Sequence, residues 1–140
     1  MLSKLSIVVG LALMYLCAAC QKPPTPDSAR KSLSGEWLLV VKSDCSDFGI
    51  RSDRLILHGN GQLEQHLEMA DGRKLDSSTD SKWSFVPDHS VSLDERFNVS
   101  KGASVEKRHE ILIVEFTNPP SILLNPDQNC FYQQTSAGKN

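Results

Sequence analysis

Hydrophobic and polar residues alternate with a period of two from residue 33 onward, and turn residues interrupt this alternation about every ten positions. In residues 62–69, for example, Leu63, Leu67 and Met69 share one parity, and glutamate and histidine residues occupy the other. This periodicity is typical of half-buried strands and not of helices. It predicts strands over residues 36–42, 54–58, 62–69, 73–77, 82–86, 91–94 with an extension to 99, 110–116, 122–124 and 130–134.

Turn residues join these predicted strands into a meander. Gly59-Asn60-Gly61 predicts a tight hairpin, because glycine takes positive φ without steric cost. Helical patterns are nearly absent, so the predicted fold class is all-β, an antiparallel up-and-down meander of about eight strands. Residues 33–134 are predicted to form one such domain, and residues 135–140 a disordered tail.

The residues before this domain carry two different patterns. Apolar residues fill positions 5–16 behind Lys4, and this stretch is too short to span a bilayer comfortably. Residues 1–19 are therefore predicted to be a signal peptide that is removed. Residues 20–32 hold three prolines among polar residues, which predicts a semi-rigid extended tether.

The end of the apolar stretch, Ala18-Ala19-Cys20, resembles the lipobox of bacterial lipoproteins. The resemblance implies that Cys20 is lipidated and becomes the first residue of the mature protein, so that its lipid attaches the protein to a membrane. Gln21 follows Cys20 where an inner-membrane retention signal would place Asp, which implies the outer membrane, with the domain facing the periplasm or the surface. The alternative is a plain secretory signal cut after Ala19, which keeps the export and loses the anchor.

The lipoprotein resemblance accounts for two of the four cysteines, because Cys17 leaves with the signal peptide and Cys20 carries the lipid. Cys45 and Cys130 remain, and we expect them to form a disulfide bond in an oxidising compartment. Cys45 follows the first predicted strand and Cys130 opens the last one. The disulfide therefore predicts that these strand ends meet, which makes the meander a closed or nearly closed barrel.

The first predicted strand opens with Gly35-Glu36-Trp37, and together with the meander this resembles the lipocalin-like superfamily. The resemblance implies a small antiparallel barrel with Trp37 packed across its base. The alternative is a glycine before a strand and an ordinary core tryptophan. Six side chains are predicted to lie inside the barrel, as core or as the wall of a ligand site: Trp37, Leu39, Leu63, Leu67, Trp83 and Phe85.

Composition argues against a nucleic-acid partner. The formal net charge is −2, from 15 basic and 17 acidic residues. A nucleic-acid surface needs a basic stripe with interleaved aromatic residues, and the best basic run is Lys107-Arg108-His109. We expect this run to be a solvated strand edge or loop.

No catalytic or metal-binding pattern stands out in the sequence. The histidines do not fall at metal-ligand spacings (His58, His66, His89 and His109). The aspartates around Cys45 lack the ligand pattern of a calcium loop and are expected to be solvated loop carboxylates (Asp44, Asp47 and Asp53). Asp94 and Glu95 are adjacent, so on a strand they are expected to point to opposite faces. We therefore expect no enzyme, no metal and no cofactor.

Two functions fit these patterns. The first is a lipid-anchored envelope module that binds a small apolar ligand or an envelope protein without catalysis. The alternative is an inhibitor or immunity protein against a periplasmic hydrolase of the protease or lysozyme type; a structural role in an envelope assembly is a third class. Barrel contents discriminate between them, because a filled interior favours a protein partner and an open apolar pocket of about 300 Å³ or more favours a carried ligand.

Overall fold

The computed structural model describes residues 24–40, 47–77, 80–125 and 130–138. These residues form one α-helix and nine β-strands, so the predicted all-β fold class is confirmed. The elements are α1 (Pro26–Leu33), β1 (Gly35–Val40), β2 (Ile50–Leu57), β3 (Leu63–Met69), β4 (Lys74–Asp76), β5 (Trp83–Val86), β6 (Ser90–Ser100), β7 (Ser104–Glu115), β8 (Ser121–Asn125) and β9 (Cys130–Ala137).

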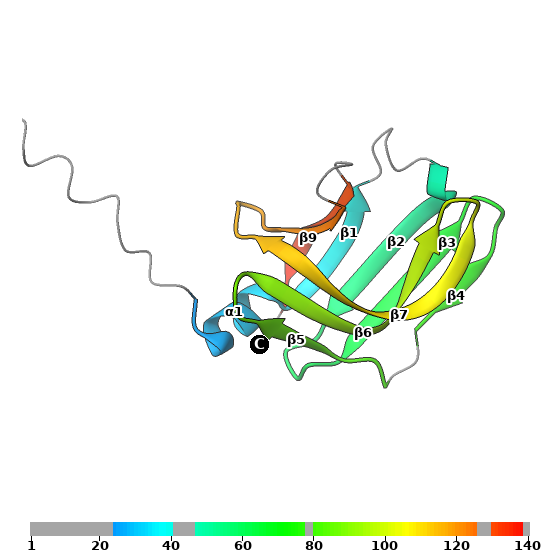
Figure 1. Ribbon diagram of the computed structural model, residues 1–140. Helices are drawn as coiled ribbons and strands as arrows, with labels where there is room; N and C mark the ends of the chain where they lie inside the picture. Colours follow the sequence, from blue (N-terminus) through cyan, green and yellow to red (C-terminus); the bar gives the residue numbers. More distant parts are fainter. Residues whose placement is uncertain (1–23, 41–46, 78–79, 126–129, 139–140) are drawn as a thin grey trace, which may run out of the picture.

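The strands form a single curled sheet in the order β4-β3-β2-β1-β9-β8-β7-β6-β5. The first and last strands of the chain, β1 and β9, lie side by side and antiparallel, with Leu38 opposite Gln133. Figure 1 shows the curl, with β5, β6 and β7 crossing in front of β2 and β3. The predicted meander is therefore barrel-like, and its first and last strands pair with each other.

The sheet is open between β4 and β5, which lie at its two ends. β4 pairs antiparallel with the end of β3, where Glu68 lies opposite Lys74. Lys82, next to β5, forms an antiparallel bridge with Gln62, next to β3. β4 and the residue before β5 therefore both lie beside the β2–β3 hairpin. The sheet has nine strands where about eight were predicted.

The helix α1 (Pro26–Leu33) corrects a prediction, because the tether expected to be extended over residues 20–32 is helical from residue 26 to residue 32. Thr25 caps the helix, and Pro26 stands in its first turn, where a missing N–H costs nothing. Ala29 and Leu33 share one face and are fully buried. Burial against the barrel thus stabilises a helix that the local pattern does not show.

The end of β9 packs closely against the start of β1. Ala137 lies opposite Gly35, and Gly138 N donates a hydrogen bond of 2.7 Å to Ser34 O. A Cβ atom on Gly35 would lie 2.0 Å from Ser136 O, and the φ of Gly35 is +136°. Gly35 is therefore needed for the close approach of two backbones. The tail predicted to be disordered from residue 135 is instead strand as far as Ala137.

The main core fills the end of the barrel that α1 covers. Trp37 is fully buried, and its indole Nε1 donates to Leu33 O at 2.9 Å. The buried members of this core are Leu33, Trp37, Leu55, Leu57, Leu63, Trp83, Val91, Leu93, Leu112, Val114, Ile122 and Tyr132. Of the six side chains predicted for the interior, Trp37, Leu63 and Trp83 belong to it, and Leu39 and Phe85 pack against it half-buried. Leu67 lies instead in a smaller cluster with Met69 and Phe97.

Candidate binding site

A bulge in β6 directs an arginine into the barrel. The register between β6 and β7 shifts between Leu93 and Arg96, and Glu95 has a φ of +53°. An extra residue at such a bulge changes which side chains face inward. Asp94 and Glu95 are both exposed, against the expectation that they lie on opposite faces, while Arg96 is only 2% exposed.

Arg96 is held by three side chains from three other strands. Its Nη1 lies 2.5 Å from Glu110 Oε2, and its Nη2 lies 3.5 Å from Asp53 Oδ2. Nη2 also donates to the hydroxyl of Tyr132, which in turn donates to Asp53 Oδ2 at 2.5 Å. The guanidinium carbon lies 5.3 Å from the centre of the Tyr132 ring. We call these residues, together with Gln65, the Arg96 network.

Gln65 joins this network to the open seam of the sheet. Its Nε2 donates to both carboxylate oxygens of Asp53 at 3.0 Å. Its Oε1 accepts a hydrogen bond of 2.7 Å from Phe97 N, and its Nε2 lies 3.2 Å from Phe97 O. A side-chain amide thus pairs with the backbone of β6 as a neighbouring strand would. Gln65 therefore links β3 to β6 across the opening in the sheet.

The Arg96 network contains more acidic than basic groups, since two carboxylates contact one guanidinium. Burial raises the pKa of Asp53 above its ordinary value of 3.8, although Arg96, Tyr132 and Gln65 act in the opposite direction. Burial also raises the pKa of Tyr132 well above 10.0, so its phenol stays protonated. Burial alone would lower the pKa of Arg96, but its interactions with Tyr132, Asp53 and Glu110 outweigh this and raise it. The guanidinium therefore remains charged at neutral pH.

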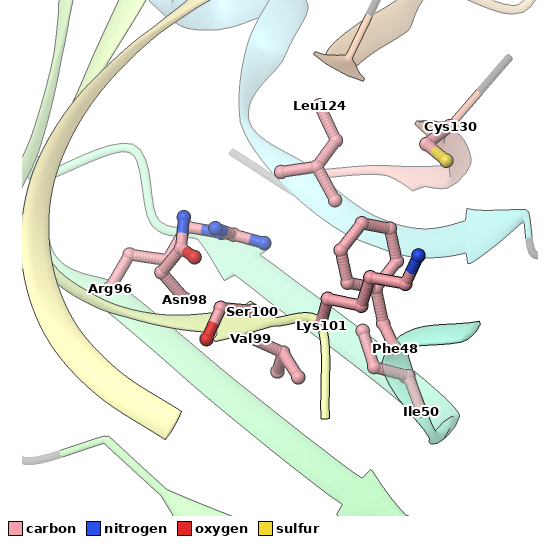
Figure 2. A pocket seen from close by; sticks show the side chains of 9 residues that line it. All are labelled: Phe48, Ile50, Arg96, Asn98, Val99, Ser100, Lys101, Leu124 and Cys130. Carbon is pink, nitrogen blue, oxygen red and sulfur yellow. The ribbon is translucent and has the colours of Figure 1, made fainter. Parts of the chain in front are cut away.

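A cavity of about 280 Å³ lies beside Arg96, at the end of the barrel away from α1. Its polar lining comes from β6 and the turn after it, and its apolar lining from β2, β6, β8, β9 and the residues before β2. Figure 2 shows Arg96 and Asn98 on one side of the cavity, with Phe48 and Leu124 on the other. The lining residues are Phe48, Ile50, Arg96, Asn98, Val99, Ser100, Lys101, Leu124 and Cys130.

One donor of Arg96 is left unsatisfied beside this cavity. Its Nε atom is buried and has no hydrogen-bond partner in the described part of the chain. A buried polar group without a partner costs about 1–3 kcal/mol. Arg96 therefore has one buried N–H without a partner, and the network occupies its other two nitrogens.

The predicted site residues lie elsewhere, with one exception. Cys130 lines the cavity, is 1% exposed and is disulfide-bonded. Cys45, its predicted partner, and Cys20, the predicted lipidation site, lie outside the described residues. The six side chains predicted for the barrel interior do not line this cavity.

The Arg96 network could not be predicted from the sequence for identifiable reasons. Asp53 was expected to be a solvated loop carboxylate, but it lies in β2 and is 1% exposed, so that prediction is wrong. The position of Gln65 did indicate a buried polar group, because this polar residue alternates in phase with Leu63 and Leu67 and therefore points toward the core. Arg96 carried none, because its inward direction depends on the bulge.

Other titratable groups sit on the outer surface. His58 Nε2 lies 2.8 Å from Glu64 Oε1, and His109 Nδ1 lies 2.5 Å from Asp94 Oδ1, all with substantial exposure. Among the described residues, no group of three or more His, Cys, Asp or Glu side chains is arranged to hold a metal ion. Nor does that part of the chain contain a helix long and apolar enough to cross a membrane.

Comparison with known proteins adds no assignment to this geometry. No protein family, no curated protein and no solved structure matches the chain.

Proposed function

We propose that this protein is a lipid-anchored envelope protein whose barrel is a non-catalytic module for a small amphipathic ligand. The observation that carries this proposal is the cavity at the open end of the barrel, where a buried guanidinium faces apolar side chains. Ligand sites commonly combine a mostly apolar wall with a few fixed polar groups. The lipobox-like residues before Cys20 support the anchor.

The size of the cavity limits the ligand. The core fills the α1 end of the barrel, and the cavity of about 280 Å³ falls just below the roughly 300 Å³ set above for a carried ligand, so barrel contents alone do not favour a ligand over a protein partner. The chemistry of the lining is what favours a ligand here. A long-chain lipid carried along the barrel axis does not fit this arrangement. A short amphipathic molecule at one end does.

Blocking the cavity tests this proposal. The soluble Cys20→Ser variant should bind a small amphipathic dye such as 1-anilinonaphthalene-8-sulfonate, measured by fluorescence titration. Leu124→Trp places a large side chain in the cavity and should abolish binding. The matched control is Leu123→Trp, on the opposite parity of the same strand, which should bind as the parent does. Equal binding by Leu124→Trp and the parent, with unchanged melting temperature, would contradict the proposal.

A second candidate, the hydrolase inhibitor, is favoured by a different surface. Ile111 and Ile113 on β7 are 60% and 49% exposed. Ile113 lies opposite Leu123 of β8, which extends the apolar row across two strands. Exposed apolar rows of this kind are typical of protein contacts. Titration against lysozyme and metalloprotease activity tests this candidate, and Ile111→Asp with Ile113→Asp should abolish any inhibition seen.

A further inference from the structure

We propose that the cavity beside Arg96 is specific for an anionic head group carried on a short apolar tail, with Arg96 and Lys101 as its charged contacts. This inference rests on the proposed function, since it names the ligand class of the same cavity. It adds the sign of the ligand charge, which the size and shape of the cavity leave open.

Among the described residues, the charged side chains that line the cavity are Arg96 and Lys101, both cationic. The carboxylates of Asp53 and Glu110 are not among the lining residues described. Both carboxylates contact Arg96 through its Nη atoms. Among the described residues, the charges that line the cavity are therefore positive, although the Arg96 network as a whole holds two carboxylates and one guanidinium.

The Arg96 guanidinium is held in one position beside the cavity. It is 2% exposed, and hydrogen bonds fix both of its Nη atoms while Nε stays without a partner in the described chain. Fixed, desolvated donors bind an anion more strongly than mobile surface donors do, because they lose little freedom on binding. An anionic head group in the cavity would lie next to this fixed guanidinium.

Lys101 adds a second charge at the mouth of the cavity. It lies in the turn between β6 and β7, is exposed, and forms no ion pair within the described residues. An exposed ammonium attracts an anion from solution, and salt screens this attraction. Asn98, whose amide donates to Glu110, completes the polar side.

The apolar side of the cavity fits the tail of such a ligand. Phe48, Ile50 and Leu124 supply aromatic and aliphatic surface, and the disulfide-bonded Cys130 adjoins them. Figure 2 shows this apolar side across the cavity from Arg96. The arrangement suits a molecule with its charge at one end.

A series of three ligands that share one tail tests the inference. Hexanoate, hexanol and hexylamine are titrated into the Cys20→Ser variant, and binding is followed by NMR chemical shifts. We expect hexanoate to bind at least tenfold more tightly than hexanol, and hexylamine to bind most weakly. Raising the salt concentration should weaken hexanoate binding and leave hexanol binding unchanged.

A charge variant separates the head group from the tail. Lys101→Gln should weaken hexanoate binding severalfold without changing hexanol binding, and it avoids the folding risk of changing buried Arg96. Lys82→Gln is the matched control, since Lys82 is exposed at another site, and it should leave both affinities unchanged.

The outcomes separate the two proposals. Equal affinities for hexanoate and hexanol would overturn the anionic specificity and leave the proposed binding function standing. Tighter binding of hexylamine than of hexanoate would also overturn the anionic specificity, because it would show that the cavity prefers a cationic head group. Absence of binding by all three ligands, together with dye binding that Leu124→Trp does not alter, would overturn both.

Discussion

Tyr132 shows how single atoms hold the Arg96 network together. Its hydroxyl accepts from Arg96 and donates to Asp53, so one oxygen connects a buried cation to a buried carboxylate. Removing one partner of such a group leaves the others desolvated and unpaired, which costs more than the lost bond is worth. The network is therefore sensitive to the loss of any one member.

Tyr132→Phe tests this sensitivity, because it removes the hydroxyl and keeps the ring. We expect a loss of about 1–3 kcal/mol in the free energy of unfolding, measured by urea denaturation. Thr135→Val is the control in the same strand, since its exposed hydroxyl donates to Glu36 O at 3.2 Å. This control should cost less than about 0.5 kcal/mol. Similar losses in the two variants would contradict the role given to Tyr132.

Asp53 gives the network a dependence on pH. Its pKa is raised in the folded protein, so between 3.8 and that raised value the folded state binds more protons than the unfolded state. The contribution of Asp53 to the free energy of unfolding therefore decreases as pH rises through this range. Asp53→Asn should remove this decrease, measured as the difference between the stability curves of variant and parent.

Asp71 provides a control of opposite sign for that experiment. The backbone N–H and the side chain of Arg73 lower the pKa of this exposed carboxyl. Its contribution is present above pH 3.8 and is lost as pH falls through the lowered pKa. Asp71→Asn should therefore lower stability above pH 3.8, and its difference from the parent should disappear as pH falls through the lowered pKa, which is a pH dependence of opposite sign to that of Asp53. Parallel curves for Asp53→Asn and the parent would contradict the raised pKa of Asp53.

The elements divide into those that local pattern determines and those that packing determines. Alternation of side chains located most strands, and the turn at Gly59-Asn60-Gly61 joins β2 to β3 as predicted. The helix α1 was missed because its apolar face holds only Ala29 and Leu33, and the barrel supplies the rest of its stabilisation. The bulge at Glu95 was missed because a positive φ is usually indicated by glycine or asparagine, and here the residue is a glutamate.

The same limit explains why the site escaped prediction. The predicted interior residues describe the core, since apolar residues at regular parity signal burial. Asp53 and Arg96 are buried against the preference of their residue types, and partners far apart in the chain make this possible. Contacts between charged residues that are far apart in the sequence can be identified only when the three-dimensional arrangement of the strands is known.

The junction of β1 and β9 can be tested through Gly35. In Gly35→Ala the new Cβ would lie 2.0 Å from Ser136 O, so we expect a loss of at least about 3 kcal/mol in the free energy of unfolding. Gly72→Ala is the control, because Gly72 also has positive φ, +90°, but a Cβ added there would meet no neighbouring atom within 4 Å. Backbone strain alone should cost this control about 1 kcal/mol. Equal losses would show that the close contact is unimportant.

For the whole molecule, the predicted anchor sets the location. Buried acyl chains contribute about 0.8 kcal/mol per methylene, so the lipidated protein should sediment with membranes. Cys20→Ser should release it into the soluble fraction, measured by fractionation and immunoblotting. Cys17→Ser is the control, because Cys17 is expected to leave with the signal peptide. Membrane association of Cys20→Ser equal to that of the parent would contradict lipidation at Cys20.

The predicted lipid anchor at Cys20 would limit how the barrel lies on the membrane. Five residues separate Cys20 from the start of α1 at Pro26. Fully extended, this piece of chain is about 20 Å long. With Cys20 in the bilayer, α1 and the end of the barrel that it covers would lie nearer the lipid. The cavity beside Arg96 is at the other end of the barrel, so its mouth would then open to the aqueous compartment. A ligand then exchanges with solution, not with the membrane that holds the protein.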